Sequence, residues 1–155
     1  LFNTSESHKR IAEAIQSMWR EHLGVEVSLI NQEWRVYLDR RSQGDYDIAR
    51  AVWIGDYPEP STFLKLWTSG SANNWVQWED ARYDALMKKA GSTLNQETRY
   101  DFYREAEDRM LQDQPIIPLY HYVTVYLKRP EVKGWEANLL DWHPYKYVRL
   151  EKLGE

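Results

Sequence analysis

One basic and one acidic side chain lie six residues apart, at either end of an otherwise apolar segment. The stretch is ARAVWIGDYPEP, residues 49–60, in which Arg50 precedes the segment and Asp56 follows it. An arginine can bind a carboxylate through two parallel hydrogen bonds, and an aspartate can pair with an ammonium group. The two side chains therefore suit a zwitterionic ligand. On spacing alone, local salt bridges or a turn at Arg50 and Asp56 remain the favoured interpretation.

Catalytic and metal-binding patterns find little support in the sequence. The four histidines are scattered and lack the spacing of metal ligands: His8, His22, His121 and His143. The chain has no GxSxG, P-loop or GxGxxG motif. Asp56 and Glu59 could be imagined as a glycosidase pair, but a loop across Pro58 does not fix the separation that this mechanism needs. We therefore expect no enzyme, no catalytic residue, no metal and no cofactor.

Composition limits the kinds of partner. The 155 residues suffice for one domain with a core, and the net charge of −4 argues against a nucleic-acid-binding surface. The absence of cysteine excludes disulfides and Cys-type zinc sites, and no apolar run is long enough to span a membrane. Eight tryptophans and eleven tyrosines are typical of surfaces that bind ligands or partners, although an aromatic core would use them equally.

The elements that would position Arg50 and Asp56 follow from hydrophobic periodicity. A helix is predicted over about 5–23, ended by Gly24, and a second over about 32–42. Strands are predicted at 25–30 and 46–54, which gives a right-handed βαβ unit with a covered, largely parallel sheet. Asp56 would then lie just past the carboxyl end of a strand, where ligands bind in open α/β sheets.

The hydrophobic pattern of the remaining residues predicts further helices, followed by strands. A short helix is expected over 60–67, and longer helices over about 80–89 and 95–112. Strands are expected at 116–128 and within the tail HPYKYVRLEK at 143–152, with Pro115 and Pro118 marking a crossover between lobes. The opening LFNTSE is typical of a strand that leads into a helix, so we expect an upstream part of the protein to be missing.

Several longer motifs occur together and in order. They are NQEW at 31–34, GDYDIAR at 44–50, WIGDYPEP at 53–60 and PIIPLYHYVTVYLKRPEVKGW at 115–135. In this combination the chain resembles the family 5 extracytoplasmic solute-binding proteins of oligopeptide and dipeptide ABC transporters. The resemblance implies an α/β fold of the type II periplasmic-binding-protein kind, a lobe with a mixed sheet flanked by helices. It also implies an incomplete fragment of a two-lobe protein, with 1–114 in the second lobe and 115–155 as crossover strands returning to the first.

The resemblance further implies a function. Such proteins bind an extended oligopeptide between two lobes, so the expected partners are the peptide, a missing N-terminal lobe and an ABC transporter permease. The expected location is periplasmic or lipid-anchored at the cell surface. Asp56 matches the residue that meets the peptide amino terminus, and Arg50 and His8 match residues that meet the C-terminal carboxylate.

Other site residues are implied in the same way. The strand that pairs with the peptide backbone matches Ala51, Val52, Trp53 and Ile54. Trp34 and Arg41 match pocket-lining positions, and Asn3 matches a backbone contact. For His8 and Arg41, an ordinary exposed helix residue remains the alternative.

Two departures from the family pattern leave alternatives open. Many relatives have glycine where this chain has Val52, which leaves a main-chain pairing role intact. Trp75 is an extra tryptophan, and a cleft lined by Trp34, Trp53 and Trp75 could stack on sugar rings. The alternatives are therefore an oligosaccharide-binding receptor of the same family and a fragment that self-associates without binding ligand. The acid placed for an ammonium group favours peptide.

Overall fold

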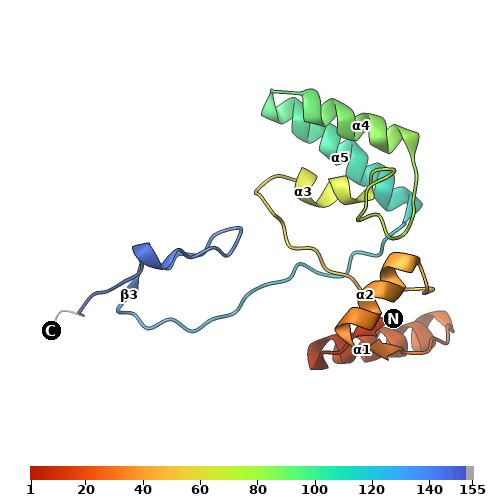
Figure 1. Ribbon diagram of the computed structural model, residues 1–155, viewed down its shortest axis with the longest axis horizontal. Coiled ribbons are helices and arrows are strands. Elements are labelled where there is room, and N and C mark those ends of the chain that lie inside the picture. The colour runs from red at the N-terminus through yellow and green to blue at the C-terminus, as the bar shows by residue number, and fades with distance from the viewer. Residues whose placement is uncertain (153–155) are drawn as a thin grey trace.

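The computed structural model describes residues 1–152, which form two helical groups and a long C-terminal segment (Figure 1). The first group contains β1 (Phe2–Asn3), α1 (Glu6–Leu23), β2 (Asn31–Gln32) and α2 (Trp34–Gln43). β1 and β2 are parallel, with Phe2 opposite Asn31, and α1 is the crossover between them. The N–H of Arg50 donates to the carbonyl of Leu1 over 2.9 Å, so the chain around residue 50 runs beside the start of β1.

Helix ends in this group follow local sequence signals. α1 begins after Ser5 and ends at Gly24, whose φ of 66° lies in the left-handed region. α2 ends at Gly44 with a φ of 73°. Glycine adopts this conformation without the clash that a Cβ introduces. The predicted extents of both helices are confirmed to within about two residues.

The second group is a helical hairpin with a short helix packed on it. Its elements are α3 (Ser61–Leu64), the 3₁₀ helix η1 (Lys65–Trp67), α4 (Ala81–Ser92) and α5 (Gln96–Asp113). Most of the core of the chain lies here, formed by Leu64, Tyr83, Leu86, Ala90, Tyr103, Ala106 and Met110. The Tyr83 hydroxyl donates to the Leu64 carbonyl over 2.5 Å, and burial raises the pKa of that hydroxyl. The three predicted helices of this region are confirmed.

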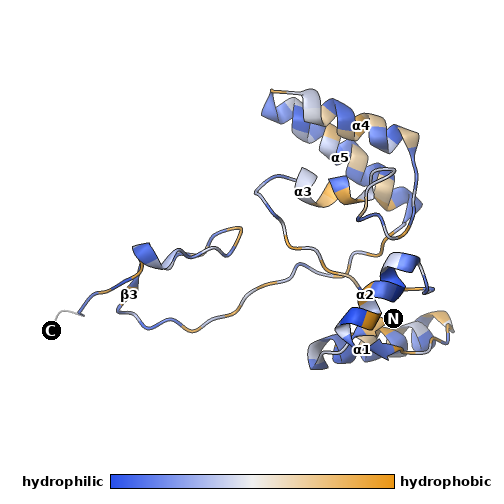
Figure 2. Cartoon of the chain, in the orientation of Figure 1, coloured by the Kyte–Doolittle hydropathy of each residue, from blue (hydrophilic) through white to orange (hydrophobic). Residues whose placement is uncertain are grey.

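The C-terminal segment leaves the helical groups as an extended run (Figure 1). It ends in an antiparallel pair of β3 (Val132–Lys133) and β4 (Arg149–Leu150), with the 3₁₀ helix η2 (Tyr145–Tyr147) before β4. Figure 2 shows apolar residues along the extended run as well as within the hairpin. Val125 is 86% exposed, so the apolar side chains of this run are not buried by the described residues.

Three of the predicted strands are wrong for the described chain. Residues 25–30, 46–54 and 116–128 form no strand, and the regular strands are two short pairs, one parallel and one antiparallel. A strand needs a hydrogen-bonded neighbour, and the part of the chain that the structure describes supplies almost none for these segments. The covered sheet expected around 46–54 is not found either, because Ile54 is 79% exposed. The prediction of a strand near the C-terminus is confirmed by β4.

No helix within residues 1–152 is long and apolar enough to cross a membrane.

Candidate functional site

The segment 50–56 connects the two helical groups (Figure 1). Its first residue is held by the hydrogen bond to Leu1, and its last by α3. Between these points, the backbone groups of residues 51–54 make no hydrogen bonds to other described residues. Ala51, Val52 and Ile54 are exposed. The predicted backbone-pairing segment is therefore open to an extended partner.

Asp56 lies beside the first turn of α3. Its N–H donates to the hydroxyl of Thr62 over 2.8 Å, and that hydroxyl lies 3.5 Å from Oδ2 of Asp56. Thr62 is fully buried, whereas Asp56 is exposed. Among the described residues no cation forms a salt bridge with Asp56. Its carboxylate is thus oriented by a buried hydroxyl and remains available to an external ammonium group.

His8 and Arg50 form a basic site at the start of α1. Burial lowers the pKa of His8, the positive charge of Arg50 lowers it further, and the Asn3 backbone partly opposes both effects. Buried atoms of His8 (Nδ1) and Asn3 (Oδ1) have no hydrogen-bond partner in the described chain. The charge of Arg50 is near enough to act on His8, and neither group forms a salt bridge with a described carboxylate, so the two are suited to binding an anion.

Arg41 is held between aromatic rings. Its guanidinium carbon lies 3.6 Å from the ring centroid of Trp75 and 5.1 Å from that of Tyr37. Its Nη1 donates to the Tyr37 hydroxyl over 3.1 Å, and this hydroxyl in turn donates to the carbonyl of Arg50. Trp34 stacks on Tyr37 at 5.5 Å and is 49% exposed. One aromatic and cationic cluster therefore links both predicted pocket residues to Arg50.

Trp53 extends this cluster. Its ring lies 6.5 Å from that of Trp75 at an interplanar angle of 51°, and the Tyr46 hydroxyl donates to the Trp75 carbonyl over 3.1 Å. Tyr37 and Tyr46 were not predicted as site residues, because the sequence marks them only as members of a helix and a strand. Trp75 was noticed only as an extra tryptophan.

Polar atoms that lack partners concentrate on the predicted residues. Six buried side-chain nitrogen or oxygen atoms have no hydrogen-bond partner within the part of the chain described, and four of them belong to Asn3, His8, Arg41 and Trp53. The other two belong to Glu131 and Trp135. Buried polar groups in native proteins are almost always paired. The four atoms therefore indicate that a ligand or another segment completes this region.

The described residues line two hollows, of which one adjoins the cluster. One of about 480 Å³ adjoins the cluster and is lined in part by Gly44, Tyr46, Trp75 and Pro115. Another of about 620 Å³ lies between η1 and α4, away from the predicted residues. Within residues 1–152 no three histidine or acidic side chains are grouped as metal ligands would be.

Comparison with known proteins shows where this arrangement occurs. Residues 1–75 match the family described as bacterial extracellular solute-binding proteins, family 5 middle. The chain is 43% identical over 138 residues to the periplasmic murein peptide-binding protein MppA of Escherichia coli, covering 89% of this chain and 26% of that protein. It is 41% identical over 138 residues to the periplasmic oligopeptide-binding protein OppA of Salmonella typhimurium, covering 89% of this chain and 25% of that protein.

The fold is shared as well. A crystal structure of Haemophilus influenzae OppA in complex with RPPGFSPFR superposes with a TM-score of 0.85 at 35% identity, covering 97% of this chain and 30% of that one. The chain thus spans between a quarter and a third of the length of these relatives. The predicted fold class, a lobe of this protein type, is confirmed. Over residues 1–75 the chain matches the bacterial extracellular solute-binding proteins of family 5, and over most of its length it is similar to the peptide-binding proteins MppA and OppA.

Proposed function

We propose that this chain forms part of a receptor that captures extended oligopeptides for an ABC importer. The matched relatives are described as murein peptide-binding and oligopeptide-binding proteins. The observation that carries the proposal is the group of unpartnered polar atoms on Asn3, His8, Arg41 and Trp53, beside the open segment that leads to Asp56. A peptide supplies a charge at each end and backbone donors and acceptors between, which is what this region lacks.

Each residue then has a role. Asp56 binds the peptide ammonium group, and Arg50 with His8 binds the terminal carboxylate, through charge-assisted hydrogen bonds. The backbone of residues 51–54 pairs with the peptide as an added strand. Side-chain pockets are lined by Trp34 and Arg41.

Asn3 completes the site as a backbone contact. It lies in β1, and its buried Oδ1 has no partner among the described residues. That oxygen would accept a hydrogen bond from a peptide N–H.

The remainder of the cleft is proposed to come from another lobe. Residues 1–114 would belong to one lobe, and 115–155 would return towards the other, although 153–155 lie outside the described residues. The extended run after Pro115, which has no partner strand among the described residues, supports this division. Lobe closure would exclude water and strengthen the charge pairing. The receptor would work outside the cytoplasm, in the periplasm or anchored at the cell surface, and would deliver peptide to a permease.

Replacement of Asp56 tests the ammonium role. In the complete protein, Asp56→Asn is expected to weaken binding of free-amine peptides on the order of tenfold to a hundredfold, because a charge pair is lost, and to change binding of N-acetylated peptides little. Isothermal titration calorimetry measures both, with Asp101→Asn, an exposed change on α5, as the control. An equal loss for both peptides would refute the ammonium role.

Oligosaccharide binding is a second candidate, supported by the half-exposed ring of Trp34. Against it, Arg41 already covers one face of Trp75 at 3.6 Å. The same titration distinguishes the two functions: binding of cello- or xylo-oligosaccharides without peptide binding would replace the peptide proposal.

A further inference from the structure

The support of Asp56 is unusual because it depends on a helix that is weakly capped. Asp56 is oriented by Thr62, which lies in the first turn of α3. α3 has only four residues, and the residue at its N-cap is Pro60, which makes no side-chain cap. So short a helix has little stability of its own. Something else must fix its first turn.

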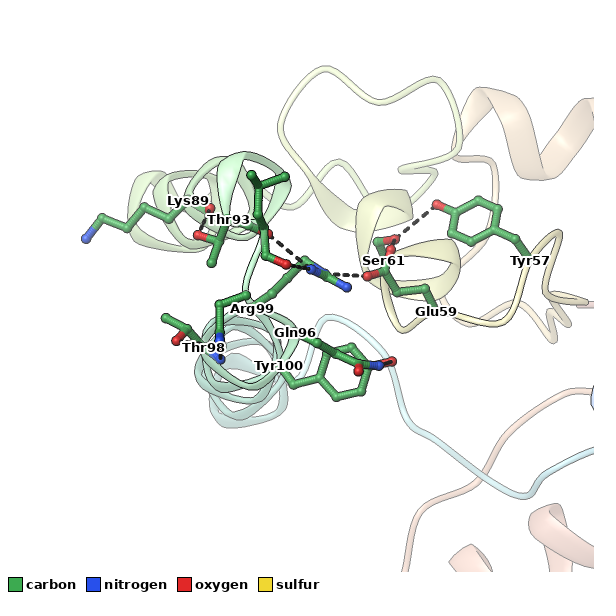
Figure 3. A network of polar contacts seen from close by, with 11 residues as sticks. Tyr57, Glu59, Ser61, Lys89, Thr93, Gln96, Thr98, Arg99 and Tyr100 are labelled. Carbon is green, nitrogen blue, oxygen red and sulfur yellow. Dashed lines mark hydrogen bonds and ion pairs between the residues drawn. The ribbon is translucent and has the colours of Figure 1, made fainter.

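A polar network around Glu59 does so (Figure 3). The Nε of Arg99 donates to Oε1 of Glu59 over 2.5 Å. The Ser61 hydroxyl donates to Oε2 of the same carboxylate over 3.3 Å and lies 3.1 Å from the Tyr57 hydroxyl. Tyr57 directly follows Asp56. The network thus connects Tyr57, which follows Asp56, to Glu59 and to Ser61 at the start of α3.

Arg99 connects this network to the helical hairpin. Its Nη1 donates to the carbonyls of Thr93 and Leu94 in the α4–α5 turn, each over 3.1 Å. The side chains of Arg99 and Glu59 are only 21% and 28% exposed, so solvent screens their pairing less than that of a surface ion pair. The guanidinium therefore donates to three acceptors, the Glu59 carboxylate and the carbonyls of Thr93 and Leu94. It fixes the position of Glu59 relative to the hairpin.

Close packing couples the position of Asp56 to that of α3. A Cβ placed on Gly55 would lie 3.2 Å from Thr62 Cγ2 and 3.2 Å from Phe63 Cζ. The backbone before Asp56 is thus already seated against the first turn of α3. A shift of that turn moves the Asp56 backbone and the hydroxyl that orients its carboxylate.

We infer that Arg99, which is distant in sequence from Asp56, is a positioning residue for this ammonium-binding carboxylate. It acts through Glu59 and the first turn of α3 and makes no ligand contact itself. The inference rests on the proposed function of Asp56. Arg99 would then determine specificity without touching the ligand, since the side chains that bind a ligand must be held within about 0.5 Å of their productive positions.

The test compares variants of the complete protein by calorimetry, with free-amine and N-acetylated forms of one peptide. Arg99→Met keeps the aliphatic stem but removes the guanidinium, and is expected to weaken free-amine binding about tenfold while N-acetyl binding changes less than about twofold. Arg99→Lys, which keeps the charge without the fork, should recover part of the loss. The control is Arg104→Met on the same helix, whose arginine is 69% exposed and, among residues 1–152, pairs with Asp101 alone.

A double-mutant cycle separates positioning from general destabilisation. Once Asp56→Asn has removed the ammonium partner, adding Arg99→Met should change free-amine binding little further. Additive losses, or equal losses for both peptides, would overturn the inference. If the single variant Asp56→Asn binds free-amine peptides as well as the wild type does, the proposed role of Asp56 itself fails, and the role of Arg99 fails with it.

A second variant guards against misfolding. If Arg99→Met does not fold by circular dichroism, Glu59→Gln replaces it, because this change keeps the shape and removes the charge. The same selective loss of free-amine binding is expected. Unchanged selectivity in folded Glu59→Gln would overturn the inference.

Discussion

At the scale of the single residue, the site contains two arginines that pair with no carboxylate of the described residues. Arg99 and Arg109 pair with Glu59 and Asp80, whereas Arg41 and Arg50 form no salt bridge within the described chain. Arg41 is instead held by aromatic faces, with its guanidinium carbon 3.6 Å from the ring centroid of Trp75. Charges kept in place without a partner are poised to bind an anion from outside the chain.

His8 leads to a prediction on pH at this scale. Its pKa is lowered by burial and by Arg50, so a bound carboxylate, which favours the imidazolium, should raise it. Binding of a peptide with a free C-terminus should therefore take up a proton and strengthen as the pH falls from about 8 to about 5. The expected gain is up to about tenfold, because only the protonated imidazole pairs with the carboxylate.

Calorimetry across this pH range measures the effect. His8→Gln and a C-terminally amidated peptide serve as controls, and both should flatten the profile. A profile that is the same for wild type and His8→Gln would contradict the role of His8.

At the scale of the element, the helical hairpin depends on one multiply bonded carboxylate. Asp80 caps α4 by accepting from the Tyr83 N–H over 2.7 Å, and its Oδ2 lies 2.6 Å from Nη2 of Arg109 on α5. Hydrogen bonds from Arg109, and then the Tyr83 N–H, lower the pKa of Asp80. One side chain thus both begins α4 and joins it to α5.

Substitution at Asp80 separates these two roles. Asp80→Ala should cost about 1–2 kcal/mol of unfolding free energy through the lost cap, and Asp80→Asn, which can still cap, should cost less. Because the folded pKa is lowered, the stabilising effect of the charge is present above the unfolded value near 4 and is lost as the pH falls through the folded value.

Urea unfolding of the wild-type protein and both variants, at neutral pH and below about pH 3, measures this. The difference between wild type and Asp80→Asn should shrink in acid. Equal stability of Asp80→Ala and wild type at neutral pH would refute the capping role.

At the scale of the whole molecule, the extended C-terminal run contrasts with the packed hairpin. Tyr122, Val123, Val125 and Leu127 are largely exposed, and the structure places no partner strand beside their backbone in residues 1–152. An exposed, extended apolar segment whose backbone groups are unpaired is a template for pairing with another chain. Within a two-lobe receptor the other lobe would cover it.

The isolated 155-residue chain is therefore expected to self-associate. Sedimentation velocity at several concentrations should show larger species as the concentration rises. Val125→Lys should reduce this association because it puts a charge on the open edge, whereas Leu94→Lys, which changes a 97% exposed residue in the α4–α5 turn, should not. A monomer at every concentration would contradict the prediction.

The sequence alone determined the helices and several of their ends, and it indicated the family by resemblance. The hydrogen bonds of a helix close within four residues, so Gly24, Gly44 and the spacing of Tyr103, Ala106 and Met110 carry their own structural information. The motifs around Arg50 and Asp56 marked the candidate site by resemblance.

Tertiary structure alone decided what those side chains face. The strands predicted at 46–54 and 116–128 do not form here, because a strand takes its hydrogen bonds from segments distant in sequence. Residues up to 42 positions apart interact in the folded chain. Arg41 stacks on Trp75, the charge of Arg50 acts on His8, and Arg99 pairs with Glu59. No local pattern encodes such pairs, since the packing of separate elements brings them together.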